Sequence, residues 1–174
     1  MLSQNTGFRR RYGSNPYSGY DTTEGSPFLF DGELDDRLRP VDRVVTVTVG
    51  DSDVAYPYTE LETQKVVHDS VGGKDIVVFW AAGTLSDLDR DTISDSRDIG
   101  GAGGFSPILD GVRLTFLSRE DGIFDEETGS EWNVLGLAVS GPNEGKRLEP
   151  VVHADHLWFS WAAFKLGTRI FRAG

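Results

Sequence analysis

The chain has 174 residues, of which 38% are hydrophobic and 26% charged, a composition typical of one folded domain. It contains no cysteine, which excludes disulfides, thiolate metal sites and a cysteine nucleophile. Acidic residues outnumber basic ones by 28 to 17, giving a formal net charge of −11, and this balance argues against general nucleic-acid binding, which needs a basic face.

The acidic excess is rich in aspartate and poor in lysine, with 18 Asp and 10 Glu against 4 Lys and 13 Arg. A high net charge repels itself and weakens the folded state at low ionic strength, and concentrated salt screens this repulsion. An acidic protein from an ordinary environment is the alternative. The scarcity of lysine favours a salt-adapted prokaryote.

No signal peptide is visible in the sequence. No apolar run approaches the roughly 20 residues that span a bilayer. The N-terminal stretch MLSQNTGFRRRYGS has basic residues but no apolar segment after them. We therefore expect no transmembrane segment, and either a cytoplasmic protein or one at the cell surface from which a leader has been removed.

Residues 1–40 are interrupted repeatedly by glycine and proline, and no hydrophobic period survives in them. The sequence therefore predicts an irregular N-terminal arm that wraps a single β-rich domain over residues 41–174. Arg9, Arg10 and Arg11 could contact an anionic partner, or be solvated or paired with the acidic body. An oligomer could form through this arm.

The first half of the domain predicts strands and one short helix. Arg43–Val49 alternates β-branched residues and predicts a strand that pairs with Val54–Pro57 in a hairpin. A helix is expected over Thr59–Lys65, beginning with capping-box spacing, followed by a strand at Val66–Asp69. Ile76–Trp80 is continuously apolar, which predicts a central strand buried on both faces.

Residues 81–104 lose the period and are rich in Gly, Ser and Asp, which predicts a long functional loop. Asp87, Asp89 and Asp91 alternate as calcium ligands do, but the glycine and the final glutamate of a calcium loop are missing. A solvated acidic loop is the simpler interpretation.

The second half predicts further short strands over residues 112–117, 123–125, 132–139, 148–152 and 168–172. A second short helix is expected with Asp155 as its N-cap and Gly167 at its end. The expected fold class is therefore mainly β (α+β): an antiparallel meander or barrel-like sheet with two short helices.

The stretch from Phe124 to Phe164 carries D-E-x-T-G-S-x-W, then G-x-A-x-x-G-P-x-x-G-x-x-L, then H-x-D-x-x-W-F-x-W-A-A-F. With the stretch VVTVTVGDSDVAYPYTELETQKVVHDSVGGKDIVVF, it resembles the family called domain of unknown function 3179. The resemblance covers most of the chain and implies no established activity. Many members carry a cysteine pair after the strand that ends here at Trp80, where this chain has Ala81-Ala82-Gly83-Thr84. This departure favours binding or structure over thiol or metal chemistry.

The histidines are the candidate metal ligands. His153-x-x-His156, with Asp155 between them and His68 elsewhere in the chain, has the residue types of a zinc or other divalent cation site. The alternative is that each histidine is packed or hydrogen-bonded singly.

Two residues are candidates for catalysis. Ser130 could act as a nucleophile with a histidine base, although its turn setting suits a hydroxyl that caps the backbone. Asp125, with Glu126, Glu127 and Glu131, could supply paired carboxylates for acid–base work, although charge clusters beside turns usually face solvent.

Aromatic residues give a third candidate site. Trp132, Trp158 and Trp161, with Phe159 and Phe164, could line a cleft for a sugar or other ring-bearing ligand, and Asp125 is a further candidate binding residue. Their alternative role is in the core, which we favour for Trp158 and Trp161.

These observations favour a non-catalytic binding or interaction module with a small-molecule or protein partner. A metal-assisted hydrolase that uses the histidines is the first alternative, and a structural subunit of an assembly is the second.

The acidic excess predicts that salt stabilises the protein. The melting temperature should rise substantially between dilute buffer and molar KCl, because screening relieves the repulsion between carboxylates. A thermal unfolding series in KCl measures this, and an equal or falling melting temperature would contradict salt adaptation.

Overall fold

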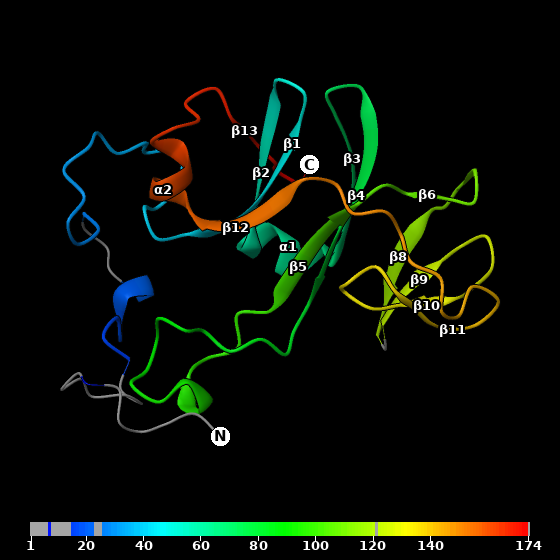
Figure 1. Ribbon diagram of the computed structural model, residues 1–174, viewed down its shortest axis with the longest axis horizontal. Coiled ribbons are helices and arrows are strands. Elements are labelled where there is room, and N and C mark those ends of the chain that lie inside the picture. The colour runs from blue at the N-terminus through cyan, green and yellow to red at the C-terminus, as the bar shows by residue number, and fades with distance from the viewer. Residues whose placement is uncertain (1–6, 8–14, 23–25, 121, 174) are drawn as a thin grey trace.

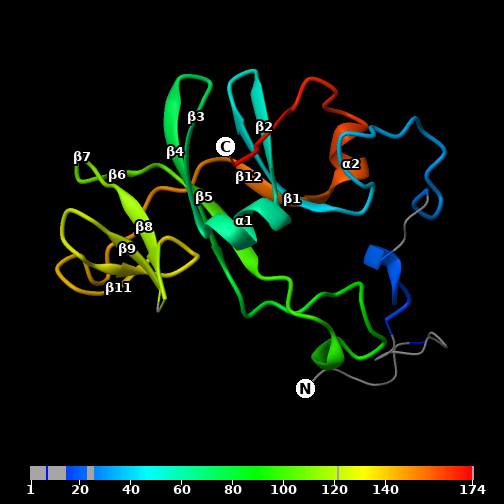
Figure 2. The same ribbon diagram turned by 180° about the vertical axis from the view of Figure 1, so that it is seen from behind.

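The computed structural model describes residues 7, 15–22, 26–120 and 122–173, and strands predominate in it. Figures 1 and 2 show two hairpins standing side by side in the centre, a group of short strands at one end and long loops at the other. The arginine cluster of residues 9–11 lies outside the described residues.

The first sheet has the strand order β12-β1-β2-β13. β1 (Arg43–Val49) pairs antiparallel with β2 (Ser52–Pro57), as the sequence predicts. β12 (His153–Leu157) pairs antiparallel with the other side of β1, and β13 (Arg169–Ile170) runs parallel to β2.

The second sheet is the antiparallel set β3 (Val66–Val71), β4 (Lys74–Ala81) and β5 (Gly101–Phe105). A third sheet follows chain order, and a small hairpin precedes it. Its strands are β8 (Phe116–Arg119), β9 (Gly122–Asp125), β10 (Glu131–Trp132) and β11 (Ala138–Ser140), after the pair β6 (Ile108–Leu109) and β7 (Val112–Arg113). The third sheet is the predicted antiparallel meander.

β4 is the strand that two cores share. Ile76, Val78 and Trp80 pack with the first sheet and the helix α1 (Tyr58–Gln64). Val77 and Phe79 point to the opposite face and pack with the third sheet. Successive side chains of a strand alternate between faces, so a continuous apolar run can serve two cores. The prediction of a strand buried on both faces is confirmed.

Strand β5 was predicted as part of the long loop, and this expectation is wrong. Gly101–Phe105 pairs with β4 along its whole length. A Cβ on Gly103 would lie 2.8 Å from the ring of Phe105, and one on Gly104 would lie 3.2 Å from Val151. The strand is glycine-rich because neighbouring side chains fill the space that its own side chains would take.

The first two sheets curl around one core without closing into a barrel, which corrects the barrel-like part of the prediction. The segment leading into β12 joins them on one side, since Val151 N–H donates to Gly104 O and Thr48 N–H donates to Val152 O. On the other side, the carboxylate of Asp69 in β3 accepts hydrogen bonds from the Tyr56 hydroxyl at 2.7 Å and from the Arg169 guanidinium at 2.6 Å.

Both predicted helices are present but begin differently from the expectation. α1 has Pro57 as its N-cap with no side-chain cap, so the predicted capping box is wrong. α2 (Trp158–Ala162) has Leu157 as its N-cap, because β12 continues through Asp155. The described part of the chain also has the 3-10 turns η1 (Tyr20–Thr22) and η2 (Ile93–Asp95). None of its helices has the length and apolar character needed to cross a bilayer.

The described part of the arm lies against the long loop between β4 and β5. Gly19 N–H donates to Asp89 O, and Tyr20 N–H donates to Leu88 O. Asp21 is buried. Its carboxylate accepts a hydrogen bond from the Ser86 hydroxyl at 2.6 Å and forms an ion pair with Arg97 at 2.8 Å. The described part of the arm is therefore bound to the β4–β5 loop by hydrogen bonds and an ion pair at one end of the molecule (Figure 1).

Trp158 provides a test of the third core, which covers the outer face of the first sheet. It is fully buried against Val44, Ala55 and Ala162. Trp158→Ala should lower the free energy of unfolding by about 3–5 kcal/mol, the range for deleting a large buried aromatic side chain. Chemical denaturation measures this change. Phe164→Ala is the matched control, since its ring is 88% exposed and its loss should change stability little. Equal effects of the two variants would contradict the packing.

Candidate functional site

Asp125 is buried at the end of β9 and receives several hydrogen bonds. Trp132 Nε1–H donates to it at 2.9 Å, Thr128 N–H at 2.6 Å and the Thr128 hydroxyl at 2.7 Å. Burial alone would raise its pKa, but the bonds from Trp132 and Thr128 outweigh this, and the pKa lies below its ordinary value of 3.8. Asp125 is therefore held as a carboxylate that fixes the turn between β9 and β10.

Ser130 belongs to the same network and is fully buried. Its hydroxyl accepts the N–H of Asn143 at 3.0 Å, and it lies 2.7 Å from the Thr128 hydroxyl. A Cβ on Gly141 would lie 2.8 Å from the Ser130 backbone, so the two turns are in close contact. The structure thus brings the candidates Asp125, Ser130 and Trp132 together, but in a packed hydrogen-bond network rather than around a hollow.

The structure does not bring the three histidines together. His153 and His156 are three positions apart on β12, so their side chains leave opposite faces of the strand. His153 packs near Phe105, and His156 packs on Trp161 with ring centres 5.0 Å apart. His68 Nε2 lies 3.0 Å from both the backbone N and O of Phe116. In the described ranges, no three potential ligand residues are grouped to hold a metal ion.

The remaining candidates also have protein partners. Asp155 accepts a hydrogen bond from the Tyr58 hydroxyl at 2.7 Å, and burial together with the Asp155 charge raises the pKa of Tyr58. Trp158 is fully buried, with Nε1–H donating to Asp35 O at 3.1 Å. In the acidic loop, Asp87 pairs with Arg43 at 2.8 Å and Asp89 accepts the N–H of Arg97.

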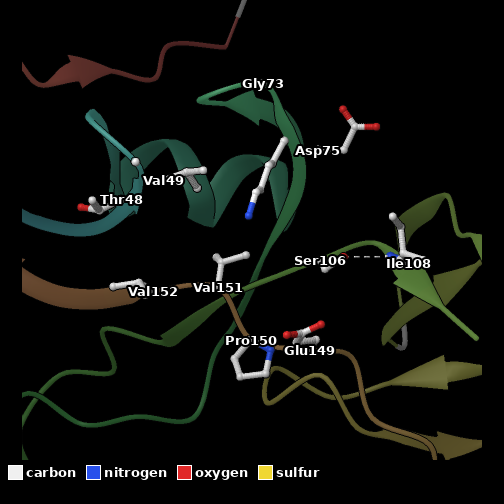
Figure 3. A pocket seen from close by; sticks show the side chains of 12 residues that line it. Thr48, Val49, Gly73, Asp75, Ser106, Ile108, Glu149, Pro150, Val151 and Val152 are labelled. Atoms are coloured by element: carbon white, nitrogen blue, oxygen red, sulfur yellow. Dashed lines mark hydrogen bonds between the residues drawn. The ribbon is translucent and has the colours of Figure 1, made fainter. Parts of the chain in front are cut away.

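A hollow of about 660 Å³ lies beside the tips of the two central hairpins. Figure 3 shows Thr48, Val49 and Val152 on one side of it and Asp75 and Ile108 on the other, with Pro150 and Glu149 below. Its volume falls within the range of ligand pockets. We call it the hairpin cleft.

Lysine 74 is the basic residue of the hairpin cleft. Of the four lysines, Lys146 pairs with Asp110, Lys165 pairs with Asp53, and Lys65 lies 3.8 Å from the centre of the Trp80 ring. Lys74 has no such partner among the described residues, although the protein has a large excess of carboxylates. Asp75 in the same cleft is already paired with Arg113 at 2.9 Å.

Sequence reasoning missed Lys74 and Glu149 as site residues. The signal available in the sequence was the excess of acids over bases, which predicts that nearly every basic side chain finds a carboxylate. Identifying the exception requires the register of β4, which begins at Lys74 directly after the Gly72–Gly73 turn.

The Asp125 network predicts a large and pH-dependent stability effect. Asp125→Asn should lower the free energy of unfolding by about 2–3 kcal/mol. The NH₂ group of the asparagine would face the N–H and O–H groups that now donate to the carboxylate, and these donors would lose their acceptor. A depressed folded-state pKa stabilises the fold above the ordinary pKa, and this contribution is lost as the pH falls through the folded value. The difference in the free energy of unfolding between the wild type and Asp125→Asn should therefore narrow below about pH 4.

Urea unfolding at pH 7 and pH 3 measures both effects. Glu126→Gln is the control, since the neighbouring Glu126 is exposed and its substitution should change stability little. A gap that stays constant with pH would contradict an ionised, stabilising Asp125.

Comparison with known proteins places the chain in a family. Neither a curated protein nor a solved structure matches it significantly. The model of the family described as "Protein of unknown function (DUF3179)" matches residues 1–168, nearly the whole chain. The Asp125–Trp132 turn, the Gly141 contact and α2 all fall within the match. The chain belongs to the DUF3179 family.

Proposed function

We propose that this protein is a non-catalytic binding module whose hairpin cleft holds a small ligand with an anionic group and an apolar body. The observation that carries the proposal is the placement of Lys74, a lysine without a carboxylate partner among the described residues, in a hollow of about 660 Å³.

The surface of the cleft supports a ligand of mixed character. Val152 and Ile108 line it with exposed fractions of 76% and 52%, so a bound apolar group would remove them from water. Thr48 is engaged with Asp53 at 2.6 Å, and Asp75 is engaged with Arg113. Lys74 and Glu149 are the charges left to orient a ligand.

A binding role agrees with the packing of the other candidates. Ser130 and Asp125 are enclosed with their hydrogen-bond partners, which disfavours nucleophilic or acid–base catalysis at either side chain. The separate placement of His68, His153 and His156 gives no support to a metal-assisted hydrolase. The contact of the arm with its own loop gives no support to a structural role in an assembly.

We also propose that the protein works at high salt in a prokaryote. The support is the net charge of −11 together with the use of only 4 lysines, since strongly hydrated carboxylates on the surface tolerate concentrated salt.

The hairpin cleft can be tested with two probes of opposite charge, N-acetyl-leucine and leucinamide, by ligand-observed NMR. Wild-type protein should bind N-acetyl-leucine more tightly than leucinamide. Lys74→Gln should weaken N-acetyl-leucine binding about fivefold, because an exposed charge-assisted contact contributes about 1 kcal/mol.

Lys146→Gln is the matched control, since it removes the same charge from a lysine outside the cleft. Equal binding by the wild-type and Lys74→Gln proteins, or a preference for leucinamide, would count against the proposed site.

A further inference from the structure

A second hollow, of about 230 Å³, shares Pro150 with the hairpin cleft but has a different chemical lining. Its walls are mainly apolar and include Phe105 and Leu135. Its polar side chains are Arg147 and His153. We call it the Arg147 pocket.

The Phe105 ring forms the aromatic wall of the Arg147 pocket, and it fits there because two neighbouring residues are glycines. A Cβ on Gly103 would lie 2.8 Å from the Phe105 ring, and one on Gly136 would lie 2.6 Å from it. The ring also packs against Phe79, with ring centres 5.4 Å apart. Gly136 also has a φ of +70°, which a larger residue rarely adopts. The wall is therefore preformed, as in most ligand pockets.

The hydrogen bonding of His153 determines which ring nitrogen a ligand meets. Nδ1 lies 2.8 Å from Val151 O. A carbonyl oxygen can only accept, so Nδ1 carries the proton of this bond. In the neutral imidazole, Nε2 is then an acceptor, and no protein donor to it is present among the described residues. A ligand with a hydroxyl or N–H could donate to Nε2.

Arg147 stands apart from most arginines of the chain. Eight of the ten described arginines pair with a carboxylate: Arg37, Arg39, Arg43, Arg90, Arg97, Arg113, Arg169 and Arg172. Arg119 lies over the Phe124 ring at 4.9 Å. Arg147 instead donates to Leu135 O at 3.0 Å, and the rest of its fork has no carboxylate partner in the described ranges.

We infer that the Arg147 pocket is a second binding site, for a small apolar carboxylate that carries a hydroxyl or amide donor next to the carboxylate. Arg147 holds the carboxylate, because its planar fork matches the two oxygens. His153 Nε2 accepts the neighbouring hydroxyl or N–H, and the apolar group of the ligand lies against Phe105 and Leu135. This site is independent of Lys74.

The test uses two probes that differ only by one hydroxyl, mandelate and phenylacetate, with binding followed by amide chemical shifts. Wild-type protein should bind mandelate more tightly, with shifts at Gly103, Phe105 and Leu135. Arg147→Gln should weaken both probes to a similar extent, about tenfold for the loss of a paired charge contact. His153→Phe keeps a ring against Phe105 and should abolish the preference for mandelate.

One control separates this site from other causes. Arg119→Gln removes the same charge elsewhere and should show the same mandelate shifts at Gly103, Phe105 and Leu135 as the wild type. The far-UV spectrum and melting temperature of each variant show that it is folded. Unchanged mandelate shifts at Gly103, Phe105 and Leu135 in Arg147→Gln would overturn the inference.

Discussion

The fold depends on β4 being apolar on both of its faces. Ile76, Val78 and Trp80 supply one core, while Val77 and Phe79 supply the other, so one strand joins two layers that would otherwise be separate units. A polar residue at any of these positions would be buried without a partner. The neighbouring strands are arranged to cover β4, and the segment 149–152 carries the chain from the side of β5 to the side of β1.

The same packing produces the two hollows. Val151 lies close to β5 because Gly104 has no side chain, so the segment that crosses between the first two sheets passes next to this strand. Pro150 in this crossing segment lines both the hairpin cleft and the Arg147 pocket. Both hollows therefore lie where this segment passes between the two sheets.

The sequence predicted the elements whose side chains carry the pattern themselves. β1 has the predicted bounds, and β4 is buried on both faces as its apolar run predicts. The sequence does not reveal β5, because its glycines carry no apolar pattern and the space beside Gly103 and Gly104 is filled by Phe105 and Val151. The sequence predicts Asp155 as an N-cap, because local rules cannot show that pairing with β1 extends β12 to Leu157.

The candidate sites show the same division between local and long-range information. Residue type pointed to His153, and the structure gives it a place in a pocket, but its companion there is Arg147 rather than another histidine. Arg147 has no distinguishing local motif. It is notable only because, in a protein with 28 acids and 17 bases, most described arginines pair with a carboxylate and this one does not. The observation behind the proposed anion site is therefore a basic side chain that lines a hollow without a carboxylate partner among the described residues, and no local sequence motif reveals it.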